Sequence, residues 1–194
     1  MGQEIEIEFK TLIDEHTFYS LLDTLPFPNK PVVQTNHYFD TKHMALKQHK
    51  SALRIREKDD SYTLTLKQPQ TRSVLETHDS LTYQEYQSWI KGQPIPKPYN
   101  SELLHNMDIQ HEDLVYYGFL KTKRYAFKQN GLEFVLDESS YLNQHDFELE
   151  LEANSYDTGL AAFEKLLQQY DIINQAPITK IARFFQALQY EEEN

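Results

Sequence analysis

The feature that most constrains the fold is a two-residue alternation of charged and apolar side chains in several separate segments. It is clearest in EIEIEFK at residues 4–10, in LRIRE at 53–57 and in FELELE at 147–152. A period of two is typical of a β-strand with one apolar and one polar face. Each segment therefore predicts a strand that packs one face against a core and carries its charges on the other.

The same patterns, extended along the chain, predict the secondary structure. Eight strands are expected at 4–10, 36–41, 51–58, 61–68, 73–79, 118–129, 132–140 and 146–153, and helices at 14–25, 82–90, 101–107, 157–170 and 179–193. Asn130-Gly131 is a strong signal for a two-residue hairpin loop and predicts that Arg124 lies opposite Asp137.

A second hairpin is expected around Asp59-Asp60, a weaker signal of the same type. This loop would place Arg54 across from Thr65 and Arg56 across from Thr63.

The two signs of charge are distributed unevenly among the predicted strands. The first and last strands carry glutamates, whereas the middle strands carry arginine and lysine. For any single strand a solvated face is the ordinary explanation. Together, the strands favour acidic strands pairing with basic ones, because this relieves the repulsion within each strand. If the helices cover the apolar faces, the charged faces line the inside of a closed sheet.

We therefore predict an α+β fold with one domain spanning 1–194. Its centre is an eight-stranded antiparallel closed β-barrel, a tunnel with a polar, charged lumen and helices packed outside. Charges inside such a lumen are tolerated only when they are paired, hydrated or bound to a ligand. The mixture of carboxylates and cationic groups suits a polyanion accompanied by a divalent metal.

Composition excludes several other classes of function. The net charge of −11 argues against binding duplex nucleic acid or docking on an anionic membrane. The absence of cysteine excludes disulfides, thiolate metal ligands and a cysteine nucleophile. The five scattered glycines cannot build a phosphate-binding glycine loop, so phosphate would have to be bound by side chains. No segment predicts a signal peptide or a membrane span, and a cytoplasmic location is expected.

Read in chain order, these motifs resemble the CYTH domains, also called triphosphate tunnel metalloenzymes. EIEIEFK contains the family's N-terminal Glu-x-Glu-x-Lys signature at residues 6–10, LRIRE its paired arginines and LTLK its lysine on the following strand. KTKR, FVLD, FELELE and TKIAR resemble its later basic strand, aspartate strand, closing glutamate strand and helix-borne lysine. Length and layout are most similar to the stand-alone bacterial proteins of the YjbK type.

The resemblance implies a tunnel fold and a metal-dependent triphosphatase. Its substrates would be inorganic tripolyphosphate or a nucleoside or thiamine triphosphate. The implied metal ligands are Glu6, Glu8, Glu148 and Glu150, and the implied catalytic residues are Lys10, Glu8 and Glu150. The implied phosphate-binding residues are Lys10, Arg54, Arg56, Lys67, Arg124 and Lys180. Further candidates are Glu4, Glu76, Lys123, Asp137, Glu152 and Arg183. Carboxylate ligands favour Mg²⁺ or Mn²⁺ over zinc.

Two alternative functions remain open from the sequence. One is a class IV-type adenylyl cyclase, which would need a surface that recognises the base. The other is a non-catalytic module that binds polyphosphate or nucleotide. In each case the partner is a small polyanion, and the protein would be a monomer or a homodimer.

Overall fold

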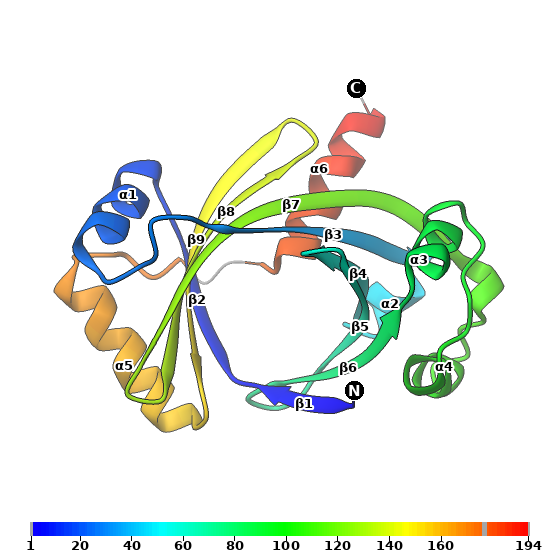
Figure 1. The fold of residues 1–194 in the computed structure, drawn as a ribbon, viewed down its shortest axis with the longest axis horizontal. Helices are drawn as coiled ribbons and strands as arrows, with labels where there is room; N and C mark the ends of the chain where they lie inside the picture. The colour runs from blue at the N-terminus through cyan, green and yellow to red at the C-terminus, as the bar shows by residue number, and fades with distance from the viewer. Residues whose placement is uncertain (1, 176–177, 194) are drawn as a thin grey trace. The chain divides into compact units, whose positions relative to one another are not determined.

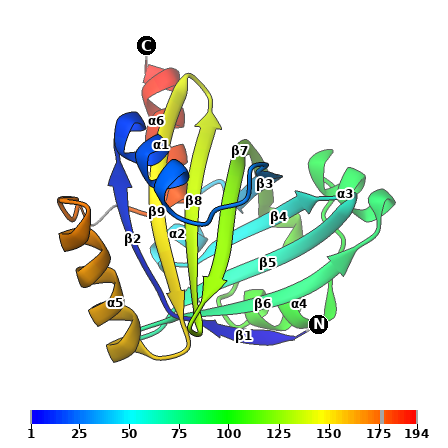
Figure 2. The same cartoon turned by 60° about the vertical axis from the view of Figure 1, so that its left-hand side comes forward.

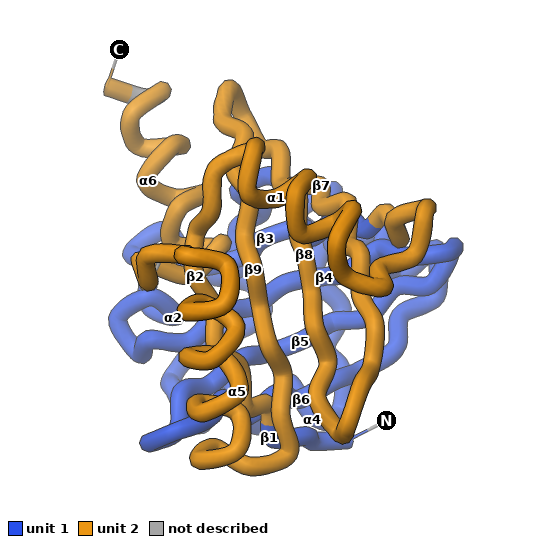
Figure 3. Tube along the Cα trace, turned by 90° about the vertical axis from the view of Figure 1, so that its left-hand side faces the viewer, with its two compact units in different colours: residues 1–5, 34–119 blue, residues 6–33, 120–194 orange. Residues whose placement is uncertain are grey.

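We describe the fold from a computed structural model that covers residues 2–175 and 178–193. These residues form two compact units, each assembled from two stretches of the chain (Figure 3). Unit 1 contains the residues up to Ile5 together with Gln34–Phe119. Unit 2 contains Glu6–Val33 together with the residues from Leu120 onward. The single domain over 1–194 stays a prediction, and its positions 1, 176–177 and 194 lie outside the described residues.

The strands of unit 1 follow one another in the hydrogen-bonded order β1-β6-β5-β4-β3-β7. The elements are β1 (Gln3–Glu6), β3 (Val32–Thr41), α2 (Ala45–Gln48), β4 (Ala52–Lys58), β5 (Ser61–Pro69), β6 (Val74–Leu81), α3 (Tyr83–Ile90), α4 (Pro98–His105), the 3-10 helix η1 (His111–Asp113) and the first part of β7 (Leu114–Gln129). Strands β3 to β6 pair antiparallel.

The core of unit 1 lies on one face of these strands. Leu53, Ile55 and Leu64 are fully buried and belong to the same apolar cluster as Trp89 of α3 and Leu104 of α4. Helices α3 and α4 can be followed beside the strands of this unit in Figure 1. Because side chains alternate along a strand, the basic residues of β4 point to the opposite face.

Unit 2 contains the order β7-β8-β9-β2, with β8 antiparallel to both β7 and β9 and β2 antiparallel to β9. The elements are β2 (Glu8–Ile13), α1 (Glu15–Thr24), the second part of β7, β8 (Leu132–Tyr141), β9 (Gln144–Ala153), α5 (Tyr156–Gln169) and α6 (Lys180–Glu193). Helix α5 lies against β2 and β9, and helix α1 lies against β9 (Figure 2). They bury Phe18 and Phe163 against Leu149 and Leu151.

The helix starts follow from local sequence. The Asp14 side chain accepts a hydrogen bond of 2.7 Å from the backbone N–H of Thr17, which caps α1. Thr82 and Glu85 form a reciprocal capping box at the start of α3. Both arrangements satisfy backbone N–H groups that have no partner within the first turn of a helix.

At Gly159 helix α5 packs tightly against the sheet of unit 2. A Cβ atom added there would lie 2.5 Å from Cε2 of Phe9 and 2.7 Å from Cβ of Ala153. Alanine normally favours a helix over glycine by about 1 kcal/mol. Here the overlap with the sheet outweighs that gain.

We therefore expect Gly159→Ala to lower the free energy of unfolding by about 1–3 kcal/mol, as measured by urea denaturation. Thr158→Ala, at an exposed position one residue earlier, should change that free energy by no more than about 0.5 kcal/mol. A Gly159→Ala protein as stable as the wild type would contradict this packing.

Both predicted hairpins are confirmed in register. Asn130 and Gly131 have φ angles of 53° and 77°, and Asp59 and Asp60 have φ angles of 48° and 57°. Such positive values at both loop residues match the twist of antiparallel strands. As predicted, Arg124 lies opposite Asp137, Arg54 opposite Thr65 and Arg56 opposite Thr63.

The first predicted strand differs from expectation, because 4–10 is divided into β1 and β2. The carbonyl of Gly2 accepts from the backbone N–H of His78 in β6, at 3.1 Å, whereas the carbonyl of Ile7 accepts from Ala153 in β9, at 2.9 Å. Each half thus bonds within its own unit. With this division the described residues form a sheet of nine strands rather than the eight predicted.

The predicted α+β class, with an antiparallel sheet and packed helices, is confirmed. Within the described residues, no helix combines the length and apolar character needed to cross a lipid bilayer.

Candidate functional site

Unit 2 gathers charged side chains on one face of β9. Glu148, Glu150 and Glu152 alternate with the leucines that face the core. The register with β8 sets Asp137 beside Glu148, and the register with β2 sets Lys10 beside Glu150. Directly opposed residues of antiparallel strands share a face. We call the resulting group the β9 cluster; it consists of Glu8, Lys10, Arg124, Asp137, Glu148, Glu150, Glu152 and Lys180.

Lys180, the first residue of α6, binds three carboxylates of the β9 cluster. Its Nζ lies 2.9 Å from Oδ2 of Asp137 and 2.5 Å from Oε1 of Glu150, and it also donates to Oε1 of Glu148. Burial alone would lower the pKa of Lys180, but attraction to Asp137, Glu150 and Glu148 raises this pKa well above its ordinary value. The ammonium group is therefore firmly protonated.

Arg124 reaches two of the same acids. Its Nε and Nη2 donate to the two oxygens of Asp137 at 2.8 and 2.6 Å, a bidentate contact. Nη2 also donates to Oε2 of Glu150 at 2.8 Å, and Nη1 lies 3.8 Å from Glu152. Burial opposes ionisation of Asp137, but attraction to Arg124 and Lys180 holds its pKa below the usual range.

Two further cations complete the surroundings of the β9 cluster. Lys10 Nζ donates to Oε1 of Glu8 at 2.5 Å. Arg183, one turn into α6, pairs with Asp146 through Nε at 2.9 Å and with Oε2 of Glu148 through Nη1 at 2.8 Å. Its Nη1 also donates to the carbonyl of Ile178. Arg183 was a candidate from the sequence, and it lies beside the Glu148 oxygen that Lys180 does not bind, a buried oxygen that accepts no hydrogen bond from the described residues.

The acids of the β9 cluster differ in how well their charge is compensated. Burial, together with the nearby charge of Glu150, raises the pKa of Glu148 to about 7 despite Lys180. Burial and the charge of Glu6 raise the pKa of Glu152 to about 7. Burial acts against ionisation of Glu150 too, but Lys180 and Arg124 hold its pKa well below the ordinary value.

The make-up of the β9 cluster bears on the implied metal. The donors are carboxylate oxygens, the ligands that Mg²⁺ and Mn²⁺ prefer. Oε2 of Glu148 is a buried oxygen that accepts no hydrogen bond from the described residues, and burial raises the pKa values of Glu148 and Glu152 to about 7 despite the nearby Lys180 and Arg124. The residues present therefore fit a divalent cation.

Unit 1 carries a second charged group, which we call the β6 cluster: Glu4, Arg54, Lys67, Glu76 and His78. Glu76 is almost fully buried at 3% exposure, and its position opposite Lys67 leads to an ion pair between the two side chains. Nη2 of Arg54 lies 3.7 Å from Oε2 of Glu76. Arg56, farther along β4, donates from Nε to Oδ1 of Asn36 at 3.2 Å.

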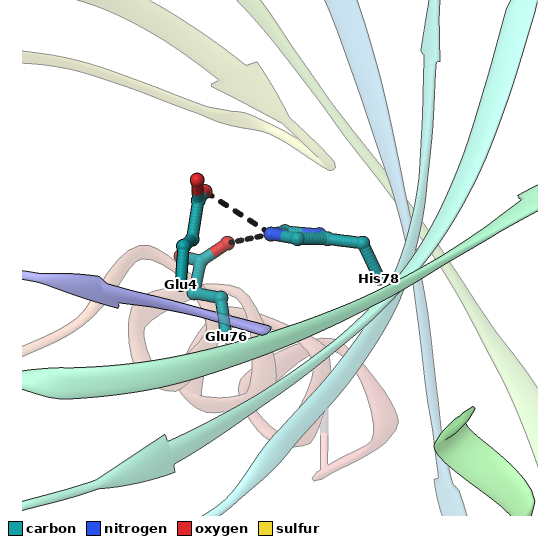
Figure 4. Close-up of side chains that lie close together, drawn as sticks. All are labelled: Glu4, Glu76 and His78. Carbon is teal, nitrogen blue, oxygen red and sulfur yellow. Dashed lines mark hydrogen bonds and ion pairs between the residues drawn. The ribbon is translucent and has the colours of Figure 1, made fainter. Parts of the chain in front are cut away.

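One ring nitrogen of His78 faces both acids of the β6 cluster (Figure 4). Its Nε2 is 3.1 Å from Oε1 of Glu4 on β1 and 3.6 Å from Oε2 of Glu76 on β6. Its Nδ1 lies 2.9 Å from Oγ1 of Thr65. Of the described residues, these three alone form a His/Asp/Glu group of three or more whose ligand atoms all lie within 4.8 Å of one another.

His78 is not among the site residues predicted from the sequence. A signal was available, because His78 and Glu76 are two residues apart on one strand and therefore share a face.

Lys123, a candidate from the sequence, does not join the β9 cluster. It is about half exposed and pairs with Glu138 at 2.8 Å, as expected for the neighbour of Arg124 on a strand.

The other predicted site residues fall into the two groups. Unit 2 brings together Glu8, Lys10, Arg124, Asp137, Glu148, Glu150, Glu152 and Lys180, and it also contains Glu6. Unit 1 contains Glu4, Arg54, Arg56, Lys67 and Glu76. The metal-binding and catalytic roles assigned to them from the sequence stay predictions.

Comparisons with known proteins agree on one family. The family model described as the CYTH domain matches residues 4–185. A Bacillus subtilis (strain 168) protein named "Putative triphosphatase YjbK" is 41% identical over 187 residues, covering 96% of this chain and 97% of that protein.

Two solved structures show the same fold. One, from Bacillus halodurans and described as a "putative adenylate cyclase", has a TM-score of 0.91 and 37% identity, covering 95% of this chain and 100% of that chain. The other is HpAC1 from Hippeastrum, described as a "putative adenylyl cyclase" that reveals a dominant triphosphatase activity. It has a TM-score of 0.78 and 24% identity, covering 95% and 96% of the two chains.

Proposed function

Since the chain belongs to the CYTH domain family, we propose that it is a metal-dependent triphosphatase. The reaction would hydrolyse the terminal phosphoanhydride bond of inorganic tripolyphosphate or of a nucleoside or thiamine triphosphate. The relative of Bacillus subtilis that is named as a triphosphatase supports this choice among the activities of the family.

The β9 cluster is the observation that carries the proposal. It combines cations that can bind phosphate oxygens with carboxyl groups whose pKa values are raised to about 7, chiefly by burial. A cluster that served only to stabilise the fold would gain nothing from carboxyl groups that are costly to ionise. Simultaneous binding of a polyanion and a divalent cation would satisfy both kinds of group.

We assign the metal to Glu6, Glu8, Glu148 and Glu150, and expect Mg²⁺ or Mn²⁺. When bound, such an ion would neutralise phosphate charge and lower the pKa of a coordinated water. Glu8 and Glu150 would orient the attacking water by accepting its hydrogen bonds. Lys10, in register with Glu150, would stabilise the charge that develops on the transferred phosphoryl group.

The remaining cations would bind phosphate oxygens. They are Arg54, Arg56, Lys67, Arg124 and Lys180. Arginine offers a planar, two-pronged donor and lysine a compact point charge. The Nε atom of Arg54 supports this role, because it is a buried donor for which the described residues supply no hydrogen-bond acceptor.

A direct assay tests the proposal. The purified protein would be incubated separately with tripolyphosphate, ATP and thiamine triphosphate in Mg²⁺, in Mn²⁺ and in EDTA, and phosphate release would be measured. We expect release from at least one of these substrates with metal and none in EDTA. Release that is undiminished in EDTA would contradict the metal dependence, and no release from any of the three would contradict the triphosphatase.

Adenylyl cyclase is the second candidate, favoured by the description of the Bacillus halodurans protein at 37% identity. Analysis of the ATP reaction for cyclic AMP against phosphate separates the two enzymes. A non-catalytic binding module would instead show calorimetric binding of tripolyphosphate without either product. A cytoplasmic location and a monomeric or homodimeric state stay predictions.

A further inference from the structure

The state of Lys180 has a consequence for how metal and substrate could bind. An ammonium group has three N–H donors and accepts no hydrogen bonds. In the structure three carboxylates surround it: Asp137, Glu148 and Glu150. Its three donors are thus matched by three anionic acceptors, so Lys180 can bind a phosphate oxygen only by giving up a carboxylate.

Most oxygens of these three carboxylates likewise already have a cationic partner. Oε2 of Glu150 accepts from Arg124, and Oε2 of Glu148 pairs with Arg183. Lys180 binds Oε1 of Glu148 and Oε1 of Glu150, and Oε2 of Glu148 is a buried oxygen that accepts no hydrogen bond from the described residues. A divalent cation held between Glu148 and Glu150 would therefore lie beside the ammonium group and compete with it for the two Oε1 atoms.

We propose that Lys180 is an exchangeable counter-ion of the β9 cluster, displaced from Glu148 and Glu150 when a divalent cation binds. A triphosphate promotes the exchange by accepting the hydrogen bonds that Lys180 otherwise gives to the carboxylates. Metal and triphosphate therefore each raise the affinity for the other, as linkage requires. The part concerning triphosphate rests on the proposed function, whereas the exchange for metal does not.

The position of Lys180 allows such an exchange without a change of fold. It is the first residue of α6, and its long, flexible stem carries the ammonium group to the carboxylates. Arg183, on the next turn, keeps its contacts with Asp146 and Glu148. The helix can therefore stay in place while the ammonium group moves.

Calorimetric titration of Mn²⁺, without any phosphate compound, tests the exchange. We expect Lys180→Met to bind Mn²⁺ at least about tenfold more tightly than the wild type, because a competing like charge has been removed. Lys123→Met is the control for net charge, since Lys123 pairs with Glu138 outside the β9 cluster. It should leave the affinity within about twofold of the wild type. An unchanged or weaker affinity in folded Lys180→Met would overturn the proposal.

A second measurement follows the wild-type protein and does not depend on the folding of Lys180→Met. The ¹⁵N side-chain NMR signal of Lys180, assigned by comparison with Lys180→Arg, should shift when diamagnetic Mg²⁺ binds. A signal that stays fixed at saturating Mg²⁺ would overturn the exchange.

The linkage is measured by repeating the Mn²⁺ titration with tripolyphosphate present, corrected for the Mn²⁺–tripolyphosphate complex formed without protein. We expect at least about fivefold tighter Mn²⁺ binding in the wild type, within the usual range of coupling between sites, and a smaller gain in Lys180→Met. Equal gains in the two proteins would overturn the linkage. If tripolyphosphate neither binds nor is hydrolysed, the proposed function fails, while the phosphate-free titration still decides the exchange.

Discussion

Lys10→Met is expected to reduce kcat for triphosphate hydrolysis by at least about 100-fold, the cost of removing one positioned stabiliser of transition-state charge. Lys10 is three-quarters or more buried, lies in register with Glu150 and donates to Glu8 at 2.5 Å. Burial would lower its pKa, but the charges of Glu8 and Glu150 raise it, so the side chain is cationic at neutral pH. Methionine keeps most of the stem and removes the charge.

Initial rates of phosphate release at saturating Mg²⁺ would measure this loss. The matched control is Lys128→Met, because Lys128 also pairs with a glutamate of unit 2, Glu133 at 3.0 Å, but is largely exposed. The control should retain the wild-type rate. Circular dichroism should show both variants folded, and wild-type turnover in folded Lys10→Met would refute the assignment of Lys10.

Asp137→Ala is expected to lower the free energy of unfolding by about 3–5 kcal/mol, because it leaves buried cations without their acid. Asp137 is fully buried, accepts a bidentate contact from Arg124 and lies 2.9 Å from Nζ of Lys180. Its pKa lies below the ordinary value of 3.8 in the folded protein. Its ionic contribution is therefore complete above pH 3.8 and is lost as the pH falls through the lowered value.

Urea denaturation at pH 7 would measure this change. Asp146→Ala is a comparison within the same unit, because Asp146 pairs with Arg183 but is more exposed than Asp137. We expect a smaller loss of stability for Asp146→Ala. Equal stability of wild type and Asp137→Ala would show that Arg124 and Lys180 do not depend on this carboxylate.

Much of the architecture was predictable because strand periodicity and short loops are local. Once Asn130-Gly131 is taken as a two-residue loop, the pairing of Arg124 with Asp137 follows by counting. The same counting from Asp59-Asp60 gives Arg54 opposite Thr65. The face that each of these side chains occupies then follows from alternation alone.

What the sequence did not reveal depends on partners distant in the chain. The division of the first strand near Ile7 arises because its two halves bond to β6 and β9, which no local pattern encodes. Helix α2 is only four residues long, too short for a helical period to be recognised. The three acids around Lys180 depend on where α6 begins relative to β8 and β9.

The pairing of β2 with β9 affects the protein while it is being made. Lys10 can pair only after Glu150, some 140 residues later, has been synthesised. At ribosomal elongation rates this delay is on the order of ten seconds. During that time β2 is an unpartnered strand, and such strands invite aggregation. The glutamates at 4, 6 and 8 repel one another and other nascent chains, so they would act as gatekeepers of solubility during translation.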